Sequence, residues 1–424
     1  MSIFRILALA VALSIPLALA DAKAAGPSLL FDPATGEVIS NDRAGEPWYP
    51  ASLTKLMTSY LVFKKLKLGQ LKLDQKIPVS EVAHVQPPSK IGVPVGKTVS
   101  VDFALQALLV YSANDMAYVL AEAVGGTWQN FVASMNETAR GLGMTGTHYV
   151  NPNGLFEPRQ ITTARDVAIL AAAILAEFPE YTHYFAQPHV AVGKRKLANR
   201  NSLIRQMPEA DGMKTGFVCN SGFNLVASAT HEGRKLVTVV FGAQSGKARA
   251  DLAQMLLVDG FSRKPESTRP RLNQLANLPL GTLVPADMTA SVCKQKPVVT
   301  MVSVHDISGW GVSFGNYDTP QKADMALRGH LLSPAGVDAA GTAGVIKLPD
   351  KQGFAAMVWN IDQARSLSMC AKYRGEKALC DVMTPETFAA IAALTPKPRS
   401  KVEKAQAQGS DDAKTKKKNK PKMN

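Results

Sequence analysis

The sequence predicts an α/β fold of the α+β kind, in which helices pack on the faces of one five-stranded antiparallel sheet. Short apolar strands on either side of a Pro- and Gly-containing turn occupy residues 29–39, as in a β-hairpin. Three more strand-like segments follow much later, within residues 212–241, and Glu232-Gly233 joins the last two. Between the two sets, apolar residues recur at helical spacing over several stretches. We therefore expect the hairpin and the three late strands to share one sheet.

The first helix is expected to begin at residues 48–55, Trp-Tyr-Pro-Ala-Ser-Leu-Thr-Lys. The apolar residues of its buried face, at i, i+3, i+4, i+7 and i+8, are Leu53, Leu56, Met57, Tyr60 and Leu61. Pro50 supplies the φ of an entering turn, so Ser52 should lie at the helix N-terminus with Lys55 one turn above it. There the hydroxyl meets free N–H groups and an amine that can take its proton. This arrangement is typical of a serine nucleophile.

A tight connection between two further helices holds a second pair of polar residues. Residues 101–110 and 116–123 are apolar helical stretches, and Ser112 and Asn114 lie in the connection between them. Side chains in such a connection can be presented rigidly, although helix capping would explain Ser and Asn equally well. The preceding stretch, residues 69–98, is polar and rich in turn residues.

Three short motifs follow one another in the chain: Ser52-x-x-Lys55, Ser112-x-Asn114 and Lys214-Thr215-Gly216. Ser112 lies 60 positions after Ser52, and Lys214 lies 102 positions after Ser112. Each motif falls in an element that suits it, namely a helix start, an inter-helix turn and an edge strand. Two similar patterns, at residues 134–136 and 291–294, have the wrong order or context. The set of three is shared by class A β-lactamases and penicillin-binding proteins.

The resemblance to one group of these proteins extends well beyond the three motifs. Further matching segments are Asp32-x-x-Thr-Gly36, Tyr49-Pro-Ala-Ser-Leu-Thr-Lys55, Gly141-Leu-Gly-Met144, Asn151-x-x-Gly-Leu155, Thr162-Thr-Ala-Arg-Asp166, Asn199-Arg-Asn201 and Asp211-Gly-x-Lys-Thr-Gly216. Over residues 26–265 the chain resembles the D-alanyl-D-alanine carboxypeptidases, the low-molecular-weight penicillin-binding proteins of the serine peptidase S11 type. The resemblance implies a β-lactamase/transpeptidase-like fold. It also implies a hydrolase that removes the terminal D-alanine from peptidoglycan stem pentapeptides and is acylated by penicillins and other β-lactams.

The same resemblance implies roles for the first two motifs. Ser52 would attack the carbonyl between two terminal D-alanines, giving an acyl-enzyme and free D-alanine. Lys55 is the implied base, and burial or a neighbouring cation such as Lys214 would keep its amine partly neutral. Ser112 and Asn114 would relay a proton to the leaving amine and hold the substrate amide.

The third motif is implied to bind the substrate. The side chains expected to engage its free C-terminal carboxylate are Lys214, Thr215 and Arg200. Gly216 would let the strand approach the ligand closely, and the backbone N–H groups of Ser52 and Phe217 would form the oxyanion hole. The chain departs from the usual family pattern at Ala113, where Gly is usual, and at Phe217, where many relatives have His.

Other activities on the same residues remain open. A DD-endopeptidase would cut peptidoglycan cross-links with the same residues. A β-lactamase would need a deacylating glutamate, and the nearest one, Glu157, adjoins Pro158 outside any Glu-x-x-Leu-Asn pattern. A scaffold that binds the cell wall without catalysis is disfavoured because all three motifs are intact.

The start of the chain indicates export. Arg5 precedes a mostly apolar run from Ile6 to Ala20, and we expect residues 1–25 to be a signal peptide. The mature protein should then act in the periplasm. No Cys/His cluster has the spacing of zinc ligands, so neither a metal nor another cofactor is expected.

The end of the chain is strongly basic. From Lys397 to Asn424 there are ten Lys/Arg and three Asp/Glu, which give +7 of the formal net charge of +14. Residues 396–424 also lack apolar periodicity, and we expect a disordered tail. Such a tail suits peripheral contact with an anionic envelope surface or simple solubilisation. Nucleic acid is a poor candidate partner because the tail has no interleaved aromatic residues.

A second, smaller domain is expected over residues 306–388, after a Pro-rich linker at residues 266–305. Its predicted element order is βαββαβ, and Thr319-Pro320 opens the first helix as N-cap and N1. This order and the opening Trp310-Gly-Val-x-Phe-Gly-x-Tyr317 resemble the SPOR domain, which binds septal peptidoglycan glycan strands stripped of stem peptides. A location at the division septum would follow.

The SPOR resemblance implies sugar contacts on the sheet face from Ser313, Asn316 and Phe354. In the alternative interpretation, Trp310, Phe354 and Trp359 are simply core residues. Four cysteines permit disulfides in an oxidising compartment. Cys370 and Cys380 join the second helix of this domain to its last strand, so we expect them to pair locally. Cys219 and Cys293 would be the remaining pair.

Overall fold

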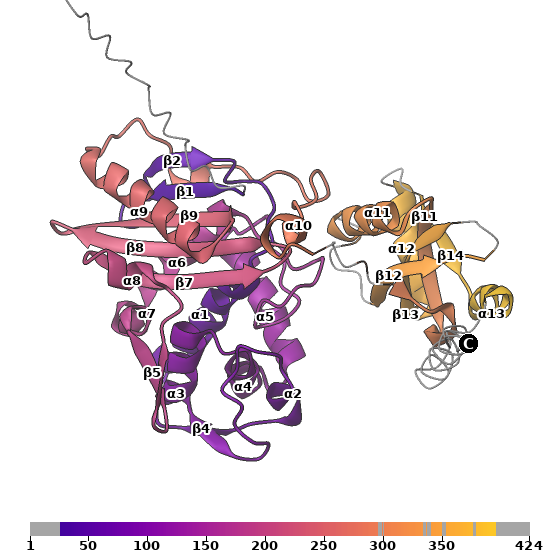
Figure 1. The fold of residues 1–424 in the computed structure, drawn as a ribbon, viewed down its shortest axis with the longest axis horizontal. Coiled ribbons are helices and arrows are strands. Elements are labelled where there is room, and N and C mark those ends of the chain that lie inside the picture. The colour runs from indigo at the N-terminus through magenta and orange to yellow at the C-terminus, as the bar shows by residue number, and fades with distance from the viewer. Residues whose placement is uncertain are drawn as a thin grey trace, which may run out of the picture.

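The computed structural model describes residues 26–295, 299, 301–333, 336, 341–349, 353–375 and 379–395. The expected signal peptide and the expected basic tail both lie outside the described residues. We call residues 26–295 the N-terminal unit and residues 301–395 the C-terminal unit (Figure 1). Among the residues that the structure describes, no helix is long and apolar enough to cross a membrane.

The N-terminal unit is built on a five-stranded antiparallel sheet of order β2-β1-β9-β8-β7. Its strands are β1 Ser28–Phe31, β2 Val38–Asp42, β7 Ala210–Val218, β8 Gly222–His231 and β9 Arg234–Ala243. The hairpin joins the late strands through β1, where Leu29 is paired with Val239. Lys214 is paired with Val226 on β8, so β7 is the outer strand that carries the third motif. The predicted five-stranded sheet is therefore confirmed.

Helices cover both faces of this sheet because strand side chains alternate between the faces. Phe31 and Val239 belong to a core shared with the larger helical side, whereas Leu30 and Leu236 belong to a second core beneath α9. The helices of the unit are α1 Thr54–Lys67, α2 Glu81–His84, α3 Val101–Gln106, α4 Asn114–Gly125, α5 Trp128–Gly141, α6 Ala164–Glu177, α7 His183–Ala186, α8 Leu203–Gln206 and α9 Gly246–Ser262. Figure 1 shows α3 and α4 at the end of the unit farthest from the sheet.

The helix expected over residues 101–110 is divided in two. After α3, residues Ala107–Tyr111 form a π-helical turn, which ends at Ser112 in a left-handed conformation with φ 67°. The N–H of Ala113 donates to the carbonyl of Ala107 at 3.0 Å. Because π turns are frequent at functional sites, the break is consistent with a functional position for Ser112.

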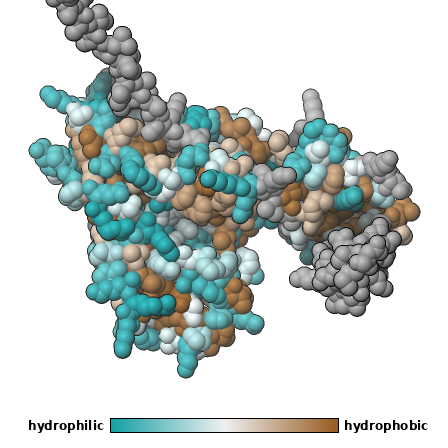
Figure 2. Space-filling model, viewed as in Figure 1, coloured by the Kyte–Doolittle hydropathy of each residue, from teal (hydrophilic) through white to brown (hydrophobic). Residues whose placement is uncertain are grey.

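Short hairpins occur where the sequence pattern predicts only turns or nothing regular. Strands β3 Lys76–Pro78 and β4 Thr98–Ser100 pair antiparallel, as do β5 His189–Val192 and β6 Arg195–Ala198. Strands of three or four residues are too short for periodicity to identify. Around α2, apolar side chains are exposed, and Figure 2 shows apolar residues gathered at this end of the unit.

From Trp310 to Met383, the C-terminal unit follows the predicted βαββαβ order. Its elements are β10 Met301–Val302, β11 Trp310–Tyr317, α11 Pro320–Leu332, β12 Thr342–Lys347, β13 Phe354–Ile361, α12 Gln363–Gly375, β14 Asp381–Met383 and α13 Pro385–Leu394. The hydroxyl of Thr319 accepts from the N–H of Lys322, as expected of an N-cap before Pro320. Two elements were not predicted: β10, which adds a fifth strand to the sheet, and α13.

The three predicted sugar contacts do not share an open sheet face. Phe354 packs with the core beneath α11 and α12. Ser313 is buried and is paired with Met357, whose side chain belongs to the opposite core, beneath α13. The register of β11 also shifts between Ser313 and Asn316. Alternation along the strands and the added helix α13 therefore contradict a sugar-binding sheet face shared by these three residues, and buried Trp359 fits the core interpretation.

The segment predicted as a linker is closely associated with the N-terminal unit over its first part. Leu272 is buried in the main core, and the N–H of Leu278 donates to the carbonyl of Gly45 at 2.9 Å. The amide of Asn277 donates to Asp166 at 2.8 Å. A Pro-rich composition disfavours long helices and strands, but it leaves the carbonyls and side chains free to bond.

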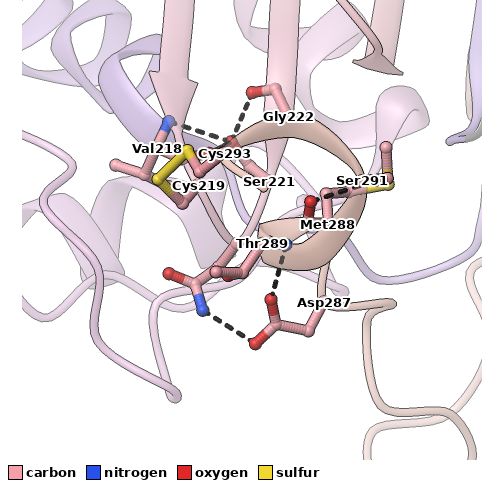
Figure 3. The surroundings of a disulfide bond; sticks show 10 residues. Val218, Cys219, Ser221, Gly222, Asp287, Met288, Thr289, Ser291 and Cys293 are labelled. Carbon is pink, nitrogen blue, oxygen red and sulfur yellow. Dashed lines mark hydrogen bonds between the residues drawn. A yellow bond between two sulfur atoms is a disulfide. The ribbon is translucent and has the colours of Figure 1, made fainter. Parts of the chain in front are cut away.

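Two disulfides link the described cysteines, and they are the pairs expected from the sequence. Cys370 is bonded to Cys380 within the C-terminal unit. Cys219 is bonded to Cys293, 74 positions later. Figure 3 shows this second bond between the end of β7 and the short helix α10, Thr289–Val292. The bond therefore attaches the strand of the third motif to the segment that leads to the C-terminal unit.

Candidate active site

Ser52 lies in a short turn that precedes α1. Residues Ala51–Leu53 form a 3-10 turn, and Thr54 then begins the α-helix. Ala51 has φ 49°, a left-handed conformation that is costly for a residue with a Cβ. The Nζ of Lys55 donates to the Oγ of Ser52 at 3.0 Å. The turn thus presents the hydroxyl of Ser52 to the amine of Lys55, the second residue of α1.

The amine of Lys55 is fully buried and is held by three different segments. Besides Ser52, it donates to the Oδ1 of Asn114 at 2.8 Å and to the carbonyl of Asn153 at 2.5 Å. Burial lowers the pKa of Lys55 to about 7, against an opposing effect of the Asp115 charge. A large fraction of this amine is therefore neutral near pH 7 and able to accept a proton.

A second buried amine lies at the other side of Ser112. The Nζ of Lys214 donates to the Oγ of Ser112 at 3.0 Å and to the carbonyl of Thr215 at 2.8 Å. Burial holds the pKa of Lys214 well below its usual value, and the positive charges of Lys55, Arg249 and Arg200 lower it further. Such an amine exchanges a proton readily, and a bound anion would restore its charge.

Glycines allow the strand β7 and the loop at residue 154 to touch the nucleophile turn. A Cβ added to Gly216 would lie 2.8 Å from the carbonyl oxygen of Pro50 and 3.2 Å from the nitrogen of Ser52. Gly154 has φ +83°, and its added Cβ would lie 1.9 Å from the carbonyl oxygen of Ala51. Because only glycine fits at both positions, the turn is confined from two sides.

These groups surround a cavity of about 350 Å³. Its lining residues are Ser52, Pro88, Ser89, Ser112, Asn114, Gly154, Leu155, Arg200, Thr215, Gly216, Phe217, Val218, Phe223 and Arg249. Seven predicted site residues belong to this lining, and the buried amines of Lys55 and Lys214 reach it through Ser52 and Ser112. The structure thus brings all the predicted residues of the active site together, and none of them lies elsewhere.

Cations dominate the charged lining of the cavity. The guanidinium of Arg200 lies 4.3 Å from the ring centroid of Tyr111 and donates to Ser89 at 3.3 Å. Among the described lining residues there is no Asp or Glu. Glu157, the glutamate considered for a β-lactamase, is instead paired with Arg159 at 3.0 Å. The cavity therefore favours an anionic ligand group.

Sequence reasoning missed Arg249, which begins the buried face of α9. Its side chain lines the cavity, donates to the carbonyl of Asn224 at 3.2 Å and lies over the ring of Phe223. Burial lowers its pKa to about 10. Arg249 lies four and eight positions before the apolar residues Ala253 and Leu257, so it belongs to the same buried helix face. A cation on an apolar helix face is the sequence signal that could have identified it.

Two further residues of the site, Asn224 and Asn153, were not predicted because their hydrogen bonds involve backbone carbonyls. The amide of Asn224 donates to the carbonyls of Tyr49 and Pro50 at 3.0 and 3.2 Å. Asn153 contributes a carbonyl to Lys55. Phe217 is predicted to supply its backbone N–H to the oxyanion hole, and its ring stacks on Phe223 with centroids 4.3 Å apart at the cavity wall.

The peptidase S11 family model, described as D-alanyl-D-alanine carboxypeptidase, matches residues 16–245 of the 424-residue chain. The chain belongs to this family. The matched range contains every predicted residue of the S11 active site. It does not extend to the C-terminal unit.

Several S11 relatives are similar over the same range. D-alanyl-D-alanine carboxypeptidase DacC of Escherichia coli (strain K12) is 36% identical over 240 residues, which cover 55% of this chain and 60% of the relative. DacA of Haemophilus influenzae is 36% identical over 239 residues, with coverage of 55% and 61%. The match therefore spans about 60% of the length of these curated relatives.

Solved structures of penicillin-binding proteins agree with this similarity. The crystal structure of penicillin binding protein 5 from Haemophilus influenzae gives a TM-score of 0.55 at 35% identity, covering 56% of this chain and 71% of that one. Penicillin-binding protein D2 from Listeria monocytogenes, in its cefotaxime-bound form, gives 0.51 at 28% identity, covering 56% and 96%. The fold around the candidate site is thus that of penicillin-binding proteins.

Replacing Gly154 with Ala should disrupt the nucleophile turn. The variant combines a strained φ with a Cβ that collides with the carbonyl of Ala51, so we expect a loss of roughly 3 kcal/mol or more in the free energy of unfolding. Gly69→Ala is the matched control, because its φ is +68° but nothing lies within 4 Å of the added Cβ. We expect only about 1 kcal/mol there. Denaturant unfolding measures the free energy of both variants. Equal losses would show that the added Cβ of the Gly154 variant does not collide with the carbonyl of Ala51.

Proposed function

We propose that this chain is a serine-type D-Ala-D-Ala carboxypeptidase that removes the terminal D-alanine from peptidoglycan stem pentapeptides. The observation that carries the proposal is the contact between Ser52 and a buried Lys55 amine whose pKa is about 7. A hydroxyl next to such a base is an activated nucleophile. Membership in the S11 family supports the reaction and the substrate.

In the proposed reaction, Lys55 takes the hydroxyl proton of Ser52 as the oxygen attacks the carbonyl between the two D-alanines. The backbone N–H groups of Ser52 and Phe217 would stabilise the oxyanion. The close approach of β7 to the Ser52 turn at Gly216 supports this pairing. The carbon–nitrogen bond then breaks, and the departing amine receives a proton through Ser112, which contacts the amine of Lys214. Water finally hydrolyses the ester and releases the shortened peptide.

The cationic cavity supports an exopeptidase. Lys214, Thr215 and Arg200 would hold the free carboxylate of the terminal residue, and Arg249 would add a further positive charge at the cavity. A bound carboxylate would also favour the charged form of Lys214. Asn114, which is bonded to Lys55, would orient the substrate amide. A DD-endopeptidase would use the same residues, so the substrate that is cleaved must separate the two activities.

We also propose that penicillins acylate Ser52, since the Listeria monocytogenes relative of the same fold has been solved in a cefotaxime-bound form. Because no described carboxylate lines the cavity, the acyl-enzyme should be long-lived, unlike that of a class A β-lactamase. Export to the periplasm fits a substrate in the cell wall. The expected signal peptide and basic tail would serve export and peripheral contact with the anionic envelope.

The C-terminal unit is proposed to bind peptidoglycan glycan strands, with a location at the division septum. The order of β11, α11, β12, β13, α12 and β14 supports a SPOR-like module. Because α13 covers one sheet face and α11 and α12 cover the other, binding would use strand edges and connecting loops, where Asn316 is exposed.

Ser52→Ala should abolish release of D-alanine from a pentapeptide that ends in D-Ala-D-Ala. Loss of the nucleophile removes the covalent route, and we expect a decrease of about 10³-fold or more. The assay measures free D-alanine. Ser134→Ala, from the similar Ser-x-Asn pattern on α5, is the control and should keep the wild-type rate. If folded wild-type protein releases D-alanine only from cross-linked dimers, the endopeptidase alternative is favoured.

The rate of penicillin acylation should rise with pH through about 7. The neutral form of Lys55 is the base, and its pKa of about 7 means that the neutral fraction increases roughly tenfold from pH 6 to pH 8. Stopped-flow labelling with a fluorescent penicillin measures this profile, and circular dichroism at each pH verifies folding. A flat profile over this interval would exclude Lys55 as the base.

Full-length protein should co-sediment with purified glycan strands that lack stem peptides. The Ser52→Ala variant should sediment equally, because the proposed binding surface lies outside the active site. Asn316→Ala should reduce the bound fraction about threefold or more if this edge contacts sugar. Equal sedimentation with and without glycan would remove the binding role from the C-terminal unit.

A further inference from the structure

The C-terminal unit contacts the N-terminal unit through α11, at Tyr49 just before the nucleophile turn. Arg328 on this helix is only 5% exposed. Its Nη1 lies 3.3 Å from the hydroxyl oxygen of Tyr49 and 3.4 Å from Asp287, and its guanidinium lies 5.0 Å from the ring centroid of Phe156. One arginine of the C-terminal unit thus contacts three separate segments of the N-terminal unit.

Apolar packing accompanies this arginine. Leu332, one turn farther along α11, is fully buried in a cluster with Tyr49 and Ile161. Farther on, the backbones come so close that a Cβ added to Gly281 would lie 3.0 Å from the Cα of Ser333. Burial of an arginine and a leucine together, with polar groups paired, is typical of a specific contact rather than a loose tether.

The residue held by this contact is three positions before Ser52. Tyr49 is 2% exposed, and its ring packs edge-on against Phe156 with centroids 5.1 Å apart. The chain then passes through Pro50 and the left-handed Ala51 to the nucleophile. A residue in such a conformation persists only where the surrounding structure over-determines it. Tyr49 is one of the points from which this turn is held.

The second N-terminal partner of Arg328, Asp287, is connected to the end of β7, which lines the cavity. Asp287 accepts from the N–H of Thr289 at 2.9 Å, at the start of α10, and from the amide of Asn220 at 2.8 Å. Figure 3 shows the hydrogen bond between Thr289 and Asp287, below the Cys219–Cys293 bond. Cys219 follows Phe217 and Val218, which line the cavity. Figure 1 shows α10 at the side of the unit that faces α11.

We propose that α11 is a docking element through which the C-terminal unit holds the active site in its reactive conformation, with Arg328 as a positioning residue. It acts through Tyr49 on the Ser52 turn and through Asp287 on the end of β7. The kinetic part of this inference rests on the proposed acylation of Ser52, whereas the docking itself does not. The C-terminal unit then stabilises the active site of the N-terminal unit, in addition to any role in binding the cell wall.

The test compares full-length Arg328→Ala, Arg328→Lys and wild type. We expect acylation of Arg328→Ala by a fluorescent penicillin to be about tenfold slower in the bond-forming step, with the binding step little changed, because the turn relaxes. Arg328→Lys should be intermediate, since one ammonium cannot reproduce the spread of the guanidinium. Arg365→Ala, an exposed arginine on α12, is the control and should match wild type.

Hydrogen exchange gives a readout that does not depend on activity. In Arg328→Ala, backbone amides of residues 48–53 should exchange several-fold faster than in wild type, while those of β1 and β9 stay unchanged. If Arg328→Ala is poorly folded, Tyr49→Phe removes only the hydroxyl that Arg328 contacts. In a double-mutant cycle with Arg328→Lys, the effect of Tyr49→Phe should be smaller when Arg328 is already replaced by Lys.

Acylation and exchange of Arg328→Ala at wild-type values would overturn the proposal, as would fully additive effects of the Tyr49 and Arg328 substitutions. If wild-type protein itself is not acylated, the proposed function fails. The exchange comparison would still decide whether α11 holds the Ser52 turn.

Discussion

The site depends on one buried amine. Lys55 is inaccessible to water, and its nitrogen is bonded to the hydroxyl of Ser52, the amide of Asn114 and the carbonyl of Asn153. Removing an ammonium from water is unfavourable by several kcal/mol, so the rest of the fold must offset this cost. What the protein gains is a base that is partly neutral near pH 7. The three segments that meet at this nitrogen come from different parts of the N-terminal unit. A displacement of any of them would change the hydrogen bonds and the pKa of the Lys55 amine.

A second constraint is the tight enclosure of the nucleophile turn. Gly154 and Gly216 permit backbone contact from two sides, and Asn224 holds the carbonyls of Tyr49 and Pro50 from behind. The left-handed Ala51 is maintained by this enclosure. The hydroxyl therefore meets its base in a fixed geometry without rearrangement, which is the condition for efficient positioning. The contacts of α11 lie on the same turn and extend the enclosure to the C-terminal unit.

Much of this organisation could be predicted from the sequence, because it depends on local patterns. Alternation identified β7, β8 and β9, and motif spacing identified residues such as Ser52 and Lys214, which the fold brings to one cavity. The π turn before Ser112 could not be predicted, since its apolar residues keep helical spacing. Arg249 and Arg328 were missed for another reason: their partners are distant in the chain, and a single arginine does not reveal them. The register of β11, which separates Ser313 from Phe354, likewise depends on pairing between strands.

The Cys219–Cys293 bond closes a covalent ring that includes β8, β9, α9 and the Pro-rich segment after it. A single proteolytic cut anywhere between these two cysteines would not release the C-terminal unit, because the bond still joins it to β7. The two pieces would separate only after both cleavage and reduction. In an oxidising compartment, a molecule nicked in this ring would therefore keep its C-terminal unit covalently attached to the end of β7.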